Sequence, residues 1–244
     1  SANVDIDSGT FVIDAADDAV HSNTNIVING GDFTIATGDD GVHADTTLTI
    51  NGGTLDITRS YEGIESAVIT LNGGSIRVVS ADDGINVAGD NDGMMGGRPG
   101  QDTFGGAASG QTLNINGGYV YVDAGGDGLD INGVLNMTDG RVIVNGPTEQ
   151  MNGALDHSGF TISGGFIVAV GSAGMAQTAD AASTQNALLL NFNTTLPAGT
   201  LINIRSSDGQ DVLTFETAKA IQSIAFSSPE LKTGTTYEVS YGGK

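Results

Sequence analysis

Apolar and polar residues alternate along short segments of this chain, and the alternation restarts at regular intervals. Within residues 32–51, the segments "DFTIAT", "GVHAD" and "TLTIN" each place an apolar side chain at every second position. A period of two is typical of a β-strand with one buried face. No helical period of 3.6 competes with it. The pattern therefore predicts three short strands in each unit.

Two sequence marks recur in register along the chain. Asparagine followed by two glycines occurs at positions 29, 51, 72 and 116, with spacings of 22, 21 and 44 residues. An acidic phrase keeps the same interval, from "DDAVH" at 17–21 and "DDGVH" at 39–43 onward. Three strands in 21–22 residues predict an all-β fold, a parallel β-helix whose coils stack on one another. Parallel crossovers are nearly always right-handed, so we expect a right-handed helix.

The repeated asparagines are expected to form a ladder. Asn29, Asn51, Asn72 and Asn116 should lie one above another, about 4.8 Å apart, with their amides hydrogen-bonded along the column. The glycines that follow supply backbone angles that other residues avoid. We interpret this ladder as a structural corner rather than a binding site.

The repeat also indicates the domain organisation. Residues 1–174 should form the β-helix, with a glycine-rich loop inserted at 89–111. Residues 175–186 are polar and should form a loop. The remaining segments, up to residue 244, read as antiparallel strands, with "SSDGQ" as a hairpin turn. We expect residues 175–244 to cap the stack, because bare strand edges aggregate.

Composition narrows the possible partners. The chain of 244 residues has 29 acidic and 8 basic residues, a net charge of −21, and no cysteine. Such a charge excludes nucleic acid as a partner and suits a protein that meets divalent cations. No stretch is apolar enough to span a membrane. The sequence begins abruptly at "SANVD", as if a leader had been trimmed away, so we expect a secreted or cell-surface protein.

Aligning the units places acidic residues in columns. Carboxylates about 4.8 Å apart repel by about 3 kcal/mol per pair at an effective dielectric constant near 20. Ca²⁺ relieves this repulsion, since it takes about six to eight oxygen ligands. The main predicted calcium cluster consists of Glu62, Glu65, Asp82, Asp83, Asn86, Asp127 and Asp130. A second is expected around Asp17, Asp18, Asp39 and Asp40. The alternative is a solvated acidic face.

The histidines give a weaker signal. His21 and His43 should stack in one column, where they could bind a transition metal, but two histidines on a strand are more often simply exposed. No spacing indicates a serine–histidine–aspartate triad or another catalytic constellation, so no catalytic residue is assigned.

One face of the first strand carries aromatic and basic residues. The alignment places Arg77 beside Tyr121, and Tyr119 beside Arg141. Aromatic rings stack on sugars, and arginine binds carboxylates through two hydrogen bonds. These four residues are the candidate carbohydrate-binding surface, and ordinary strand-surface residues are the alternative.

The units quoted above, together with "GSAGMAQTADAASTQNALLLNF" (171–192) and "SSPELKTGTTYEVSYGG" (227–243), resemble a bacterial family. It is the calcium-binding, polysaccharide-lyase-like family of carbohydrate-binding domain-containing proteins. The resemblance implies a right-handed β-helix, bound calcium, and secretion or surface display. It also implies binding to plant cell-wall polysaccharide, either cellulose or pectin-like acidic chains. The motif that carries over is the "DDG" corner with the polar position after it.

Two functions compete on this basis. The first is a calcium-stiffened binding module for polygalacturonate, cellulose or a related glycan. The second is a calcium-dependent pectate-lyase-type enzyme, for which Arg59, Arg77 and Arg141 are the candidate bases. An adhesin or ice-binding solenoid is a weaker third possibility. A likeness of fold does not establish activity, and we favour the binding module.

Overall fold

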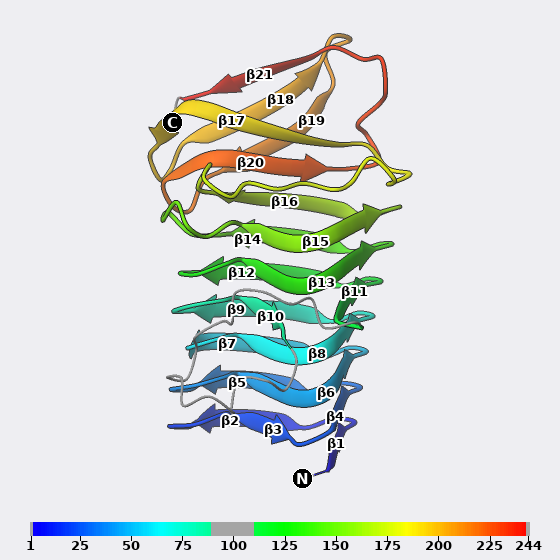
Figure 1. The fold of residues 1–244 in the computed structure, drawn as a ribbon, viewed down its shortest axis with the longest axis vertical. Coiled ribbons are helices and arrows are strands. Elements are labelled where there is room, and N and C mark those ends of the chain that lie inside the picture. The colour runs from blue at the N-terminus through cyan, green and yellow to red at the C-terminus, as the bar shows by residue number, and fades with distance from the viewer. Residues whose placement is uncertain (1, 89–109, 243–244) are drawn as a thin grey trace.

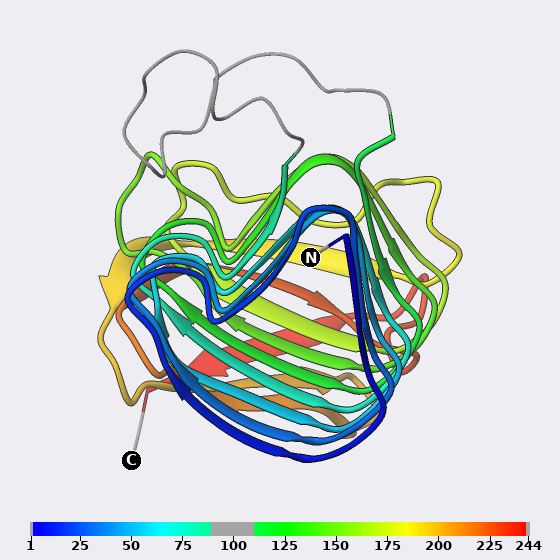
Figure 2. The same ribbon diagram turned by 90° about the horizontal axis from the view of Figure 1, so that it is seen from below.

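Each repeat of the chain contributes strands to two parallel sheets, which stack as a β-solenoid of about seven turns (Figure 1). The computed structural model describes residues 2–88 and 110–242. Viewed along the stack, successive turns follow the same path (Figure 2). The predicted all-β parallel solenoid is therefore confirmed. Within these two described ranges no helix is long and apolar enough to cross a membrane.

The first sheet, sheet A, contains the strands that follow the acidic corners. Its members are β1 (Asn3–Ile6), β3 (Val20–Ser22), β4 (Asn25–Ile28), β6 (Val42–Ile50), β8 (Ile64–Leu71), β10 (Ile85–Val87), β11 (Thr112–Ile115), β13 (Leu129–Met137) and β15 (Leu155–Ile162). The second and third strands expected in each unit merge into one in β6, β8, β13 and β15, whereas β3 and β4 remain separate. A register shift between Ala44 and Thr47 marks the bend where the two were expected to separate.

The second sheet, sheet B, contains the strands that follow the asparagine corners. Its parallel members are β2 (Thr10–Asp14), β5 (Asp32–Ala36), β7 (Thr54–Ser60), β9 (Ser75–Ser80), β12 (Tyr119–Ala124), β14 (Arg141–Asn145) and β16 (Phe166–Gly171). The alternating burial of these strands turns one set of side chains into the core and the other outward.

The core is built from columns of apolar side chains in register. One column on sheet A begins at the partly buried Val4 and continues through buried residues, namely Ile26, Leu48, Ile69, Leu113, Leu135 and Phe160. Burying a side chain of this size contributes about 1.5–3 kcal/mol. The 22-residue period thus stabilises the stack, because each turn places the same face inward.

The asparagine ladder is present as expected. Asn51 donates from Nδ2 to Oδ1 of Asn29 at 2.8 Å, and Asn72 donates to Asn51 at the same distance. Asn116 donates to Asn72 at 2.9 Å. The second glycine of each mark has a positive φ, for example 91° at Gly53. The corner therefore needs glycine there, which confirms its structural role.

The glycine-rich insertion interrupts one turn of the solenoid, but the strands on either side of it keep their register with the turn before. Strands β10 and β11, on either side of the insertion, both pair with β8, Ile85 with Ile64 and Thr112 with Val68. Residues 89–109 of the expected loop lie outside the described residues. Gln111 belongs to the stack, since its carbonyl accepts the N–H of Val134 at 3.1 Å.

The C-terminal segment continues sheet B and then forms a small sheet of its own. Strands β20 (Ile221–Ser227) and β17 (Ala187–Leu196) extend sheet B beyond β16, with β20 antiparallel to it. Strands β19 (Asp211–Glu216), β18 (Leu201–Ser206) and β21 (Tyr237–Tyr241) form an antiparallel sheet, the cap sheet. The predicted hairpin at 206–210 is confirmed, with Gly209 at a φ of 92°.

The polar segment 175–186 protects the last edge of sheet A. Asp180 Oδ2 accepts the N–H of Phe160 at 2.9 Å, and Ser183 Oγ accepts the N–H of Ile162 at 3.0 Å. Side chains therefore satisfy the hydrogen-bonding groups that a further strand would otherwise satisfy. This structural role could not be seen in the sequence, where the segment reads only as a loop.

Candidate metal and carbohydrate sites

The acidic columns lie at the corner that leads into the strands of sheet A. Residues that the alignment of the units placed in one column also pair in register in the structure. His21 pairs with His43, His43 with Glu65, Glu65 with Asn86, and Asn86 with Asp130. The turn of Asp83 lies directly beside that of Asp127, because the main-chain N–H of Gly84 donates to the carbonyl of Asp127 at 2.9 Å.

The corner aspartates also have a structural role that sequence reasoning missed. Asp18 Oδ1 accepts the main-chain N–H of Asp40 at 3.2 Å, and Asp83 Oδ1 accepts that of Asp127 at 2.6 Å. Asp127 Oδ1 in turn accepts the N–H of Gly153. One oxygen of each carboxylate therefore joins two turns. These bonds offset part of the repulsion along the column, which the sequence argument had assigned to a cation alone.

Three carboxylates converge at one of these corners. Oxygens of Asp83, Asp127 and Asp130 lie within 4.8 Å of one another. Asp83 is 2% exposed and Asp130 is 6% exposed. A Cβ at Gly126 would overlap carboxylate oxygens of Asp82 and Asp83, so only glycine fits between these side chains.

A buried amide adjoins this group. Asn86 is 1% exposed and pairs in register with Asp130. Its Nδ2 donates to Glu62 Oε2 at 2.9 Å, whereas its Oδ1 is buried and has no hydrogen-bond partner among the described residues. Carboxylate and amide oxygens are the ligands that Ca²⁺ prefers. The donor set therefore fits a hard cation.

Two other predicted metal ligands make further contacts of their own. Glu65 groups with Asp40 and His43 instead of with Asp83. Asp82 accepts the Tyr61 hydroxyl at 2.6 Å, and this bond raises the pKa of Tyr61. Of the seven expected residues, Asp83, Asp127 and Asp130 thus form one carboxylate group, and Glu65 belongs to another. The second expected cluster is partly assembled, with oxygens of Asp17, Asp18 and Asp39 within 4.8 Å of one another.

The pKa values of neighbouring acidic and histidine side chains shift in different directions within the first turns of the stack. Burial opposes ionisation of Asp18, but hydrogen bonds with His43 and His21 outweigh it and lower its pKa to about 2. Burial and a hydrogen bond with Glu65 raise the pKa of Asp40. Burial opposes the charged form of His43, yet the hydrogen bond with Asp18 and the nearby carboxylates raise its pKa. Burial and the charges of Asp18 and Asp17 raise the pKa of Asp39.

The outer face of sheet B carries the aromatic and basic residues that the alignment placed side by side. Arg77 pairs in register with Tyr121, and Tyr119 with Arg141, as predicted. The Arg77 Cζ atom lies 6.0 Å from the centroid of the Tyr121 ring, and its Nη1 lies 2.9 Å from Asp56 Oδ1. Tyr119 is 38% exposed.

The same face continues to a residue that the sequence analysis missed. Phe166 is the next residue in register after Arg141, whose Cζ lies 4.1 Å from the centroid of the Phe166 ring. Tyr119, Arg141 and Phe166 therefore form a continuous row, called here the sheet B row. A sequence signal could have found Phe166, since the weak mark "SGG" at 163–165 precedes it as "TDG" at 138–140 precedes Arg141.

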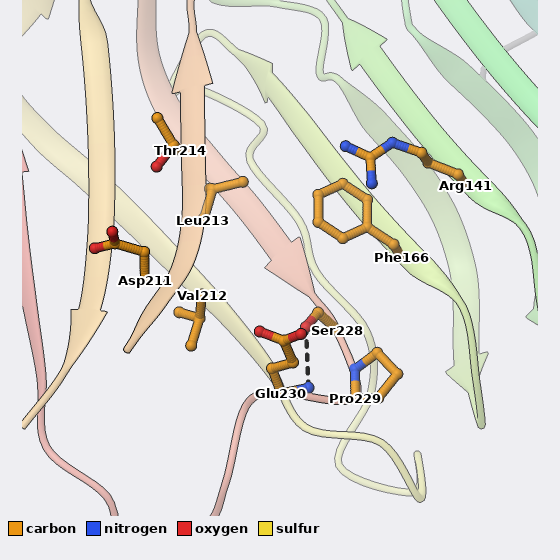
Figure 3. Close-up of a pocket in the computed structure, with 9 residues that line it drawn as sticks. All are labelled: Arg141, Phe166, Asp211, Val212, Leu213, Thr214, Ser228, Pro229 and Glu230. Atoms are coloured by element: carbon orange, nitrogen blue, oxygen red, sulfur yellow. Dashed lines mark hydrogen bonds between the residues drawn. The ribbon is translucent and has the colours of Figure 1, made fainter. Parts of the chain in front are cut away.

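The sheet B row ends in a pocket of about 460 Å³ between the solenoid and the cap sheet (Figure 3). Arg141 and Phe166 face it from β14 and β16, and residues of β19 and the segment after β20 face it from the other side. Its polar groups include Asp211, which binds Arg205 at 2.7 and 3.2 Å, and Glu230. This pocket depends on how the C-terminal segment folds back, so the sequence did not reveal it.

Comparison with known proteins gives a partial match. Residues 1–84 match a family model described as "Carbohydrate-binding domain-containing protein". The matched region covers the first turns of the solenoid, including His21, His43 and the first acidic corners. No curated protein and no solved structure shows significant similarity to the chain.

Proposed function

We propose that this protein is a calcium-dependent carbohydrate-binding protein, which holds a polysaccharide along the outer face of sheet B. The observation that carries the proposal is the sheet B row, in which Tyr119, Arg141 and Phe166 lie in register on three adjacent strands. Neighbouring strands are about 4.8 Å apart, so the row offers contacts at short, regular intervals. The family match of residues 1–84 supports the same class of function.

The chemistry of this face favours an acidic polysaccharide. The chain carries a net charge of −21, which repels polyanions from most of its surface. Arg77 and Arg141 bring guanidinium groups to the outer face of sheet B, where each can bind a uronate carboxylate. Tyr119 offers an exposed ring for stacking on a sugar face. We infer a pectin-like chain such as polygalacturonate, with cellulose as the neutral alternative.

Calcium is assigned to the corner of Asp83, Asp127 and Asp130. The three carboxylates converge there, and the amide oxygen of buried Asn86 has no hydrogen-bond partner in the part of the chain that the structure describes. Bound calcium would neutralise carboxylates of adjacent turns and stiffen the solenoid that displays the sheet B row. Cell-wall polysaccharides lie outside the cell, so we propose secretion or display at a bacterial surface.

Binding assays test the proposal. Affinity electrophoresis and calorimetry with polygalacturonate and soluble cellulose oligomers should show binding, and Tyr119→Ala and Arg141→Ala should each weaken it about tenfold, or ~1.4 kcal/mol. Tyr241→Ala and Arg205→Ala are matched controls, since both residues lie exposed on the cap sheet and not on sheet B. Equal losses in the controls, or no binding to either glycan, would refute the assignment.

A further inference from the structure

Two histidines lie at equivalent positions of adjacent turns and face one carboxylate. His21 on β3 pairs in register with His43 on β6. Asp18 Oδ2 lies 2.7 Å from His21 Nδ1 and 3.3 Å from His43 Nδ1. The two rings meet edge to face, with centroids 5.0 Å apart. The same nitrogen of each ring therefore points toward the same oxygen.

The outer nitrogen of each ring also has a polar neighbour. His21 Nε2 lies 3.3 Å from the amide of Asn23, and His43 Nε2 lies 3.7 Å from Asp45 Oδ1. Both neighbours follow their histidine by two residues, in "HSN" and "HAD". Metal-bound histidines commonly direct their second ring N–H to a carboxylate or another acceptor, which orients the ring. Asn23 can serve in this way because a turned amide presents its oxygen.

We propose that His21, His43 and Asp18 bind a divalent transition metal ion of the Zn²⁺ class. Ligands about 2.0–2.1 Å from a tetrahedral ion are roughly 3.3 Å from one another. The two Asp18 contacts, 2.7 and 3.3 Å, lie close to this spacing, and all three ligand atoms are within 4.8 Å of one another. Small side-chain adjustments would complete the geometry.

The crowding of carboxylates around His43 supports a cation there. Asp40 Oδ2 and Glu65 Oε2 approach the same Nδ1 atom, at 3.5 and 3.8 Å, in addition to Asp18. An imidazole nitrogen carries at most one hydrogen, which serves one acceptor well. A metal ion instead satisfies both histidines and Asp18 together, while the other two carboxylates remain in its outer shell.

The ligand types separate this site from the calcium corner. Imidazole nitrogen suits Zn²⁺, Cu²⁺ and Ni²⁺, whereas Ca²⁺ takes oxygen ligands. Three protein ligands leave a fourth position for water or another small ligand. The ion would join the second and third turns of the solenoid, independently of polysaccharide binding on sheet B.

Metal titration of the full chain tests this site. Metal-stripped protein is titrated with Zn²⁺ against a chromophoric chelator, with millimolar Ca²⁺ present throughout. His21→Gln and His43→Gln should each lower Zn²⁺ affinity by at least about tenfold to a hundredfold. His157→Gln, which alters a histidine on β15 far along the stack, should leave the affinity unchanged.

Cu²⁺ provides a spectroscopic readout of the ligands. The electron paramagnetic resonance spectrum of the wild-type protein should show coupling to two imidazole nitrogens, and each variant should lose one. Circular dichroism without metal confirms that the variants fold. Displacement of Zn²⁺ by Ca²⁺, oxygen-only coupling in the wild type, or unchanged affinity in both variants would overturn the proposal.

Discussion

The main-chain N–H of Asp127 donates a 2.6 Å hydrogen bond to the carboxylate of Asp83, which precedes it by 44 residues. Two repeats of sequence thus span one step of the stack. The bond places the two turns in register even though residues 89–109 lie between them in the chain.

The first prediction concerns this insertion. Replacing residues 89–109 with a short glycine–serine turn, while keeping Gly110 and Gln111, should preserve the fold, because β10 and β11 both pair with β8. A change of loop length costs only about 1 kcal/mol or less. Circular dichroism and the melting temperature should remain close to those of the parent. An insoluble or molten product would show that the segment is part of the core.

Calcium should stabilise the protein. Adding Ca²⁺ at a hundredfold excess over Kd to metal-stripped protein should raise the free energy of unfolding by about 2.7 kcal/mol. Asp130→Asn should abolish most of this increase, because Asp130 is one of the three converging carboxylates. Differential scanning calorimetry with and without Ca²⁺ measures it.

Asp32→Asn is the matched control for this experiment. Asp32 is exposed on sheet B and belongs to none of the carboxylate groups found among the described residues. It should therefore respond to calcium as the wild type does. The corner would be excluded as a calcium site if Ca²⁺ did not change the free energy of unfolding of the wild type. The same holds if Asp32→Asn lost the calcium-dependent increase as fully as Asp130→Asn does.

The asparagine ladder should contribute measurably to stability. Asn51 donates to Asn29 and accepts from Asn72, so Asn51→Ala removes two hydrogen bonds. At about 0.5–1.5 kcal/mol each, the expected loss is about 1–3 kcal/mol. Chemical denaturation measures it against Asn193→Ala, at an exposed position of β17, which should change stability by less than about 0.5 kcal/mol. Equal values for the two variants would contradict a stabilising ladder.

The features that the repeat period determines, such as the asparagine ladder, could be predicted from the sequence. A constant period fixes which side chains stack, so Asn29, Asn51 and the pairing of Tyr119 with Arg141 follow from spacing alone. The direction in which a side chain points does not follow from spacing. Glu65 Oε2 lies 3.8 Å from His43 Nδ1, for example, a contact that spacing alone does not reveal. The pocket beyond Phe166 depends on contacts between distant segments, which no period encodes.

His157 should make stability depend on pH. Burial lowers its pKa below the usual 6.5, and neither ring nitrogen has a hydrogen-bond partner among the described residues. Asp180 and Asp156 oppose this shift only in part. The unfolded chain therefore binds more protons at His157 than the folded chain does. The free energy of unfolding should decrease as the pH falls through 6.5.

The variant His157→Phe isolates this effect. Phenylalanine keeps the ring that packs against Phe160, with centroids 5.6 Å apart, but it cannot be protonated. Between about pH 7.5 and 5.5 its melting temperature should fall less than that of the wild type. Other titrating groups are common to both proteins and cancel in the comparison. Parallel pH profiles would show that His157 does not contribute.

Polysaccharide should be bound without being cleaved. A pectate-lyase-type elimination needs a base within about 3 Å of the proton that it removes, close to the calcium ion. Arg59, Arg77 and Arg141 all lie on sheet B, where the first two pair with Asp14 and Asp56 and the third stacks on Phe166. The three carboxylates of Asp83, Asp127 and Asp130, in contrast, lie at the corner that leads into the strands of sheet A.

Absorbance of unsaturated uronide measures this activity directly. Incubation with polygalacturonate and Ca²⁺ should give retention of the glycan but no increase in absorbance, because none of these three arginines contacts the acidic corner. Arg98 lies outside the described residues, so Arg98→Ala is assayed alongside Arg77→Ala. A rapid increase that either variant abolishes would reverse the assignment and make the protein an enzyme.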